Sequence, residues 1–431
     1  MSAVTRLAHR ALPAQLFYGW YIAASGAAMN FLTFGIASLG LGVFIKPMDE
    51  ELGWGIAAIS FGFSLRSFEQ GLLAPVAGVL VDRIGPRRMV FSGIVLLTAG
   101  LVLFSQARHL WVYFAASLII AFGQSLTSGN PFNAALMNWF QRRRGQAMGL
   151  LTAGRGGGYF IVPVIALLVG SVGWRETVLI SAVVIAGAGL PLALLVRDRP
   201  EPYGYLPDGD LLPEERDEGS APQLASSRGG MEVREALRTP AFWLLTIATG
   251  ICSAQSIAWT VHQIPHMQDV GFSLGQAGLI VAVYGAVQVD IRPFVGWLAD
   301  ALGRKRLLVA SYVLQGVGLL LFAYLDASRA WMLGLYYLTY ASGHAIWVIL
   351  YITAVADYFG SRRFATLQGF TSALAMPLGV AAPFLAGLAF DEAGSYRMVF
   401  SVYAVATVAV AFLVAAARPP ARAAARDAAA A

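Results

Sequence analysis

Three polar side chains are spaced four residues apart in a mostly apolar stretch of the sequence. Tyr284, Gln288 and Arg292 follow the pattern i, i+4, i+8, which places them on one face of an α-helix. An arginine inside an apolar segment is costly in a membrane, and a guanidinium can bind a carboxylate through two parallel hydrogen bonds. The pattern therefore predicts an anion site with Arg292 as its cation. The alternative is that this long side chain extends to water at the helix end.

Three further charged residues interrupt apolar segments. Arg66 and Glu69 are three residues apart, so we predict that they form an ion pair on one helix face, with a proton-relay role for Glu69 as the alternative. Arg155 has no partner nearby in the sequence. It could face a cavity or pair with another helix, and both possibilities stay open.

Histidine changes its charge near neutral pH, so buried histidines are candidates for carrying a coupled proton. His262 and His344 are such candidates, and a plain hydrogen bond between helices is the alternative for each. Asp290 is another proton candidate beside Glu69. It lies two residues from Arg292 in the sequence, and this spacing places it on a different face of the helix.

The amino-acid composition indicates the class of protein that holds these residues. Of the 431 residues 58% are apolar and 13% are charged, against about 25% charged in soluble domains. This indicates a membrane protein. Basic residues occur in short clusters between apolar runs, which argues against nucleic-acid binding. Cys252 is the single cysteine, so we expect neither a disulfide framework nor a thiolate metal site, and no metal or cofactor is predicted. The first seventeen residues lack the apolar core of a cleaved signal peptide.

A helix needs about 20 mostly apolar residues to span a membrane. By this measure the sequence predicts an all-α fold with twelve spans, at 19–45, 54–80, 89–107, 112–137, 146–170, 176–197, 241–265, 273–296, 307–325, 330–356, 365–389 and 396–417. The polar stretch between the sixth and seventh spans predicts two bundles of six. The expected units are a tail 1–18, a first bundle 19–197, a linker 198–240, a second bundle 241–417 and a tail 418–431. A short surface helix is expected within Met231–Arg238.

One motif occurs twice, 218 residues apart. GVLVDRIGPRR spans Gly78–Arg88, and GWLADALGRKR spans Gly296–Arg306. A second echo, FQRRRG at 140–145 and FGSRRF at 359–364, has a shift of 219. Repeats in the same order indicate two copies of one structural unit. The motif residues that we assign to conformational change are Gly78, Asp82, Gly85, Arg87, Arg88, Gly296, Asp300, Gly303, Arg304 and Lys305.

The motif has a physical interpretation of its own. Gly78 and Gly296 are expected to allow close helix contact. Asp82 and Asp300 lie at helix ends, where a carboxylate can cap a neighbouring helix or pair with loop arginines. Such a contact is either a latch, made in one conformation and broken in another, or a static anchor.

The distribution of Lys and Arg sets the orientation. If both termini are inside, 22 of the 30 basic residues are in inside segments and 5 in outside loops. We therefore expect both termini and the linker in the cytoplasm, with the protein in a bacterial inner membrane.

The doubled G-x-L-x-D-x-x-G-x-[KR]-[KR] motif resembles the signature of the major facilitator superfamily. FYGWY at 17–21, GVFIKPMDEELGW at 42–54, RDRPEPYGYLPDG at 197–209 and DIRP at 290–293 are similar to the branch of monocarboxylate transporters and oxalate:formate antiporters. This resemblance implies two six-helix halves with a substrate cavity between them, working by alternating access. It also implies that Lys46, at the outer end of the first helix, and Arg292 contact the substrate.

Placement by analogy adds Asn30 on the first helix to the substrate contacts. We also assign to them His262, toward the outer part of the seventh helix, and Tyr351, which shares a stripe with His344 on the tenth. Two positions depart from the branch. Gln288 stands where animal monocarboxylate transporters have aspartate, and the span 365–389 lacks the lysine of the oxalate branch.

The resemblance implies a secondary transporter of small monocarboxylates, similar to lactate or pyruvate, with a proton as the second cargo and the lipid bilayer as its surroundings. No nucleic acid and no obligate protein partner are expected. The alternatives are an organic anion exchanger of the oxalate:formate type and a drug:proton antiporter. The absence of arginine from 112–137 disfavours the drug:proton antiporter. An enzyme is not expected, because the sequence has no Walker loop, HExxH or GxSxG motif.

Overall fold

The computed structural model describes residues 17–127, 130–141, 143–209, 231–359 and 364–417. Every regular element within these ranges is a helix, which confirms the all-α fold. Eleven helical segments there are long and apolar enough to cross a membrane. The 29-residue helix α4 (Ile56–Ile84) lies beside them at the position of the second predicted span. At 1.5 Å per residue its length is also sufficient.

The described residues of the first half form eleven further elements besides α4. They are α2 (Gly19–Phe34), η1 (Gly35–Leu39), η2 (Gly40–Phe44), α3 (Ile45–Leu52), α5 (Pro86–Ser105), α6 (Leu110–Thr127), α7 (Asn130–Trp139), α8 (Arg144–Gly157), η3 (Gly158–Phe160), α9 (Ile161–Val172) and α10 (Trp174–Leu195). Consecutive elements such as α2, η1 and η2 continue one span, so this half contains six spans.

The linker carries the short elements η4 (Glu201–Tyr203), η5 (Pro207–Gly209) and α11 (Val233–Ala236). The second half contains α12 (Pro240–Asp269), α13 (Leu274–Leu302), α14 (Arg304–Ala323), η6 (Ala327–Arg329), α15 (Met332–Tyr336), η7 (Tyr337–Ala341), α16 (Ser342–Phe359), α17 (Phe364–Ala393) and α18 (Arg397–Ala416). Their ends lie within a few residues of the predicted ends, except that α13 runs on to Leu302.

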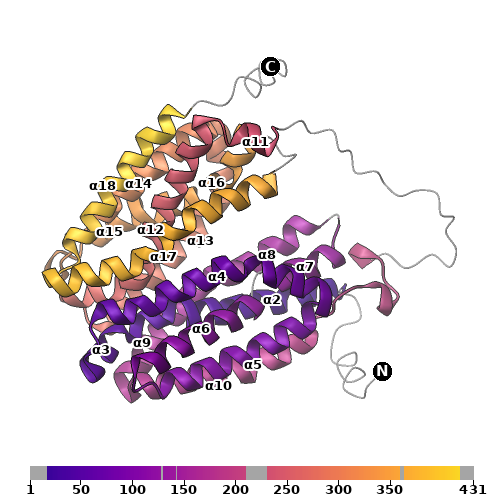
Figure 1. Ribbon diagram of the computed structural model, residues 1–431, viewed down its shortest axis with the longest axis horizontal. Helices are drawn as coiled ribbons and strands as arrows, with labels where there is room; N and C mark the ends of the chain where they lie inside the picture. The colour runs from indigo at the N-terminus through magenta and orange to yellow at the C-terminus, as the bar shows by residue number, and fades with distance from the viewer. Residues whose placement is uncertain (1–16, 128–129, 142, 210–230, 360–363, 418–431) are drawn as a thin grey trace.

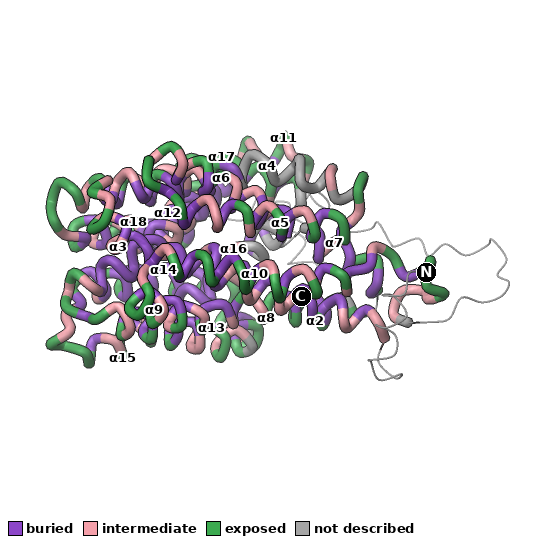
Figure 2. The backbone as a smooth tube through the Cα atoms, turned by 90° about the horizontal axis from the view of Figure 1, so that it is seen from below, coloured by how far each residue is buried: buried purple, intermediate pink, exposed green. Residues whose placement is uncertain are grey.

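The two halves form two groups of helices side by side, indigo to magenta and pink to yellow (Figure 1). Buried residues lie between the helices, and exposed ones lie mainly on the outside and at the ends (Figure 2). The outward surface includes exposed apolar side chains such as Leu167, Val183 and Phe412. A surface of this kind is suited to lipid rather than water.

The halves are joined at one end of the molecule, which we call the closed end. There Lys46 of α3 forms an ion pair with Asp269 of α12. Asp391 of α17 accepts hydrogen bonds from the backbone N–H groups of Ile56 and Ala57 at 3.1 and 3.0 Å, and so caps the N-terminus of α4 from the opposite half.

Backbones approach closely at the same end. A Cβ atom on Gly387 of α17 would lie 2.9 Å from the Cα of Ala57, and one on Gly42 would lie 3.1 Å from the carbonyl oxygen of Val261. Both contacts join the two halves. Small residues therefore allow the close packing that membrane helices need in the absence of a hydrophobic drive.

The linker leaves the first half at the other end, and its start is docked there. Asp198 accepts a hydrogen bond from the N–H of Arg87 at 2.9 Å, and the Trp139 indole donates to the carbonyl of Arg197 at 3.0 Å. The Arg197 guanidinium lies over the rings of Tyr18 and Tyr203, at 3.7 and 3.9 Å from their centres. The first residues of the polar linker are thus part of the folded half.

Candidate functional site

The predicted polar face of α13 is a hydrogen-bonded column. The helix starts with a capping box, in which Ser273 and Gln276 bind one another's backbone N–H groups. Further along, Arg292 Nη2 donates to Gln288 Oε1 at 3.0 Å, and Gln288 Nε2 donates to Tyr284 Oη at 2.5 Å. The amide therefore holds the guanidinium from one side and the phenol from the other.

His344 joins this column from α16. Its Nδ1 lies 2.6 Å from Gln288 Nε2 and 2.8 Å from Tyr284 Oη, and its Nε2 lies 3.0 Å from Ser256 Oγ of α12. An amide nitrogen only donates, so Nδ1 is the acceptor and Nε2 carries the proton. The network therefore assigns a neutral imidazole, which suits a site next to the positive charge of Arg292.

Arg292 has hydrogen-bonding capacity to spare. The guanidinium has five N–H donors, and its buried Nε has no partner. Asp290 is exposed and is not part of the column. A cation held by a neutral amide, with donors unused, is a suitable receptor for an anion.

Aromatic rings surround the column on several sides. Trp259 of α12 lies 4.5 Å from Tyr284 between ring centres, and Tyr159 of η3 lies 5.6 Å away. On α16 the ring of Trp347 stacks on His344 at 5.4 Å and on Tyr351 at 4.8 Å. These contacts fix the orientation of the polar groups and give the site apolar walls.

The first half contributes a second cation. Arg155 of α8 is exposed, and its guanidinium lies 4.7 Å from the centre of the Phe34 ring. A Cβ on the adjacent Gly156 would lie 3.0 Å from Cγ2 of Val289, which sets α8 against α13 near Arg292. The sequence left the direction of Arg155 open, and the structure places it between the halves.

Three predicted substrate contacts lie elsewhere in the fold. Lys46 is bound to Asp269 at the closed end. Asn30 donates to the carbonyl of Leu151 at 3.0 Å. His262 is fully buried between Tyr396 Oη at 3.1 Å and the carbonyl of Pro383 at 2.9 Å. Each of these side chains already has a protein partner, whereas Tyr351 stacks beside the column.

The predicted ion pair between Arg66 and Glu69 is wrong for this structure. Arg66 Nη2 donates to the carbonyl of Ala37 and, at 3.0 Å, to Oε1 of Gln124. Both carboxylate oxygens of Glu69 are buried without a hydrogen-bond partner. The reason is local. The chain turns as a π-helix at η1, where Ala37 lies, and the arginine binds a carbonyl of that turn instead of the acid.

The repeated motif is symmetric in its backbone. Gly85 and Gly303 have φ of +82° and +84° and precede α5 and α14 in the same way. This conformation favours glycine, so the repeat preserves a turn. Gly296 was expected at a close helix contact, and this is wrong here, because a Cβ on it would meet nothing within 4 Å. Gly78 and the side chains of Asp82 and Asp300 lie outside the described part.

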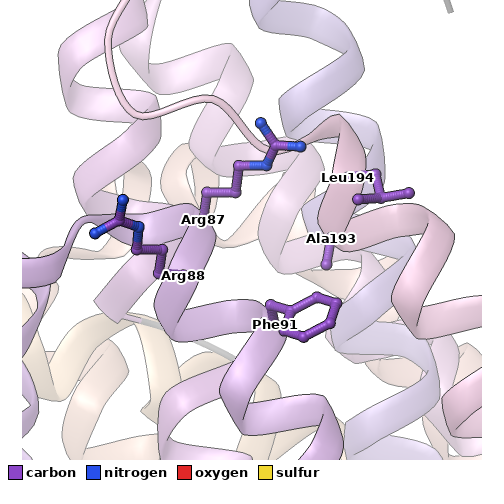
Figure 3. Close-up of a pocket in the computed structure, with 5 residues that line it drawn as sticks. All are labelled: Arg87, Arg88, Phe91, Ala193 and Leu194. Carbon is purple, nitrogen blue, oxygen red and sulfur yellow. The ribbon is translucent and has the colours of Figure 1, made fainter. Parts of the chain in front are cut away.

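The basic residues after these glycines lie beside the last helix of each half. Arg87 and Arg88 line a hollow of about 340 Å³ together with Phe91, Ala193 and Leu194 at the end of α10 (Figure 3). In the second half Lys305 Nζ donates to the carbonyls of Ala415 and Ala417 at 2.8 and 2.6 Å, at the end of α18. A cation at a helix C-terminus is stabilising, which gives these positions a structural role.

Ser256, Tyr159 and the position of Arg155 were not found from the sequence. Ser256 is an ordinary serine in an apolar run, and nothing local indicates its bond to a histidine 88 residues away. Tyr159 follows three consecutive glycines at 156–158, which could have indicated a close helix contact. A Cβ on Gly285 of α13 would indeed clash with Cβ of Tyr159.

Comparison with known proteins gives consistent results. A family model described as Major Facilitator Superfamily matches residues 23–262 and 252–431. The oxalate:formate antiporter of Oxalobacter formigenes is 23% identical over 333 residues, which cover 76% of this chain and 75% of that protein. Monocarboxylate transporter 13 of Bos taurus is 26% identical over 402 residues, 92% of this chain and 88% of that protein. A crystal structure of the nucleoside transporter NupG aligns with a TM-score of 0.71 at 16% identity, over 92% of this chain and 99% of that one.

Proposed function

The chain belongs to the Major Facilitator Superfamily and is a multi-pass membrane transporter rather than an enzyme, and we propose that it moves small monocarboxylates together with a proton. The preferred substrates resemble lactate and pyruvate. The observation that carries this proposal is the Arg292 guanidinium, which is held by Gln288 and has an unused buried donor. The names of the relatives support a carboxylate as cargo.

Binding follows from the geometry of the column. Gln288 engages Nη2, which leaves the remaining donors of Arg292 to grip a carboxylate in a fork. The neutral His344 adds no second positive charge, and the rings of Tyr159 and Trp347 suit the short apolar part of such a substrate. Losing one partner of a buried charge pair costs about 3–5 kcal/mol, which is a hundredfold or more in affinity.

The orientation that we propose puts both termini and the linker in the cytoplasm, in the inner membrane of a bacterium. Its basis is the 22 basic residues in one set of segments against 5 in the other. The closed end then faces outward, because Lys46 lies there. The conformation is accordingly inward-facing, and alternating access requires the contacts of the closed end to break while each half moves as a body.

A second candidate function is exchange of organic anions of the oxalate:formate type. One observation favours it. Arg155 and Arg292 come from opposite halves, on helices that meet at Gly156 and Val289, so an anion with two charged groups could bridge them. A carrier with two cations in its site should also change conformation more readily when a bound anion neutralises them than when it is empty. Such a carrier returns loaded, which is exchange.

The test is uptake of lactate, pyruvate and oxalate into liposomes containing the purified protein, with and without an inward proton gradient. We expect lactate and pyruvate uptake to respond to the gradient. Arg292→Ala and Arg292→Lys should both lose binding, since lysine lacks the planar fork. The matched control is Arg329→Ala, which removes an exposed loop arginine. Oxalate uptake that is faster than lactate uptake and insensitive to the gradient would overturn the proposal in favour of exchange.

A further inference from the structure

Glu69 is a buried acid without a partner. It lies on α4, its relative exposure is 6%, and neither carboxylate oxygen accepts a hydrogen bond. A carboxylate in such surroundings is strongly destabilised unless it is paired, and an unpaired acid takes up a proton instead. The geometry therefore describes a neutral side chain.

The nearest cation is engaged elsewhere. Arg66 lies one helical turn earlier on α4, but its Nη2 binds the carbonyl of Ala37 and the Gln124 side chain. Gln124 is in turn bound to Ser38 Oγ at 2.7 Å. Arg66 thus supports the π-helical turn η1, and its buried Nε is still without a partner.

No other charge is close to Glu69 among the described residues. Helices α3, α5, α6, α7 and α17 pack against α4. Tyr113 of α6 is the titratable group beside the Arg66 turn, and its hydroxyl donates to the carbonyl of Ile59. Asp391 of α17 caps the start of α4, thirteen residues or about 20 Å from Glu69. The other charged groups at the ends of the neighbouring helices are Lys46, Asp49, Glu50 and Glu51 of α3, Arg87 and Arg88 of α5, and Glu392 of α17.

We propose that Glu69 is the proton-binding site of the transporter and that the observed conformation is its protonated form. Loss of the proton leaves a carboxylate one turn from a guanidinium. Arg66 then turns from Ala37 and Gln124 to pair with it, and the π-helical turn loses its support. The proton is released to water and nothing else changes covalently.

The turn held by Arg66 is in contact with the segment that carries the anion site. A Cβ on Gly158 of η3 would lie 2.9 Å from the backbone nitrogen of Gly35 in η1. The next residue, Tyr159, packs on α13 beside Tyr284. A change in η1 therefore reaches the Arg292 column through one backbone contact and one ring contact, which gives proton release a route to the substrate.

The first experiment rests on the proposed function and compares wild-type protein with Glu69→Gln in liposomes. Gln mimics the neutral acid, so counterflow of lactate should persist within a few-fold. Glu69→Gln should lose the accumulation of lactate that a proton gradient drives. In the wild type, a gradient of one pH unit should accumulate lactate about tenfold if one proton moves with each substrate. Glu50→Gln, an exposed acid on α3, should retain both activities. Gradient-driven accumulation by Glu69→Gln equal to wild type would overturn the proposal.

A second measurement does not depend on the substrate. Infrared difference spectra of the purified protein between acid and alkaline pH should contain the carbonyl band of a buried carboxylic acid. Glu69→Gln should lack it and Glu50→Gln should retain it. An unchanged band in Glu69→Gln would refute the assignment even if lactate proved not to be transported. Conversely, loss of the band without lactate transport would retain the proton site and reject the proposed substrate.

Discussion

Asp391 holds the closed end together, and its removal should open that end by a predictable amount. The carboxylate accepts from two N–H groups at the start of α4, which belongs to the opposite half. Replacing a capping residue by alanine costs about 0.5–2 kcal/mol. Because the carboxylate is exposed, we take about 1 kcal/mol, which changes the ratio of closed to open molecules about fivefold.

The assay is cysteine labelling at a position buried only while the end is closed. Ser60 is fully buried, and its hydroxyl lies 2.9 Å from the place of a Cβ on Gly387. Ser60→Cys is therefore a small change at the contact of α4 with α17. The native thiol, Cys252, is removed as Cys252→Ala. A maleimide should label the cysteine at position 60 about fivefold faster when Asp391→Ala is added, because labelling follows the open population.

The matched control is Asp326→Ala. Asp326 lies in a loop at the same end and also accepts two hydrogen bonds, but from Ser328 N at 2.8 Å and Ser328 Oγ at 2.6 Å within its own loop. Its removal should leave the labelling rate unchanged. Equal rates with and without Asp391→Ala, or the same increase with Asp326→Ala, would contradict the idea that this carboxylate joins the halves.

Three further predictions concern substrate, movement and topology. Arg155→Gln should weaken oxalate binding at least tenfold and lactate binding only a few-fold, because only the dianion needs a second cation. Displacement of a bound substrate measures both affinities, and equal losses would contradict this prediction. Asp82→Asn should slow transport but leave the binding affinity within a few-fold, as measured by uptake and binding on the same protein, if the motif is a latch. Trypsin added to right-side-out vesicles should spare the linker arginines Arg216 and Arg228, and cleavage there would reverse the proposed orientation.

The spans and the repeat could be predicted because both depend on local sequence. A membrane span needs a run of apolar residues, so its position follows from composition within a few residues. The turn before α5 and the turn before α14 are matched because each needs a glycine at positive φ, Gly85 and Gly303. The column on α13 was predictable for the same reason, since helical spacing alone puts Gln288 and Arg292 on one face.

Contacts between helices were not predictable in this way. Whether Arg66 binds Glu69 or the carbonyl of Ala37 depends on the rotation of α4 against η1, which a single helix pattern does not contain. The same holds for Ser256 and His344, and for Arg155, whose direction depends on how α8 meets α13. The site is therefore a product of packing, and the sequence identified only the part that lies on one helix.

The described part of the chain contains two π-helical turns, η1 and η7, and we expect the fold to change shape at them. A π-turn leaves carbonyl groups without their usual partners, and side chains take their place. In η1 the carbonyl of Ala37 is bound by Arg66, and in η7 the carbonyl of Tyr337 accepts from Ser342 Oγ at 3.3 Å. One turn lies between Glu69 and the first-half side of the anion site, and the other immediately precedes the helix of His344. A bond from a side chain is easier to exchange than one within a helix. We therefore expect changes in charge at Glu69 or at Arg292 to be absorbed at these two turns while the surrounding helices move as rigid bodies.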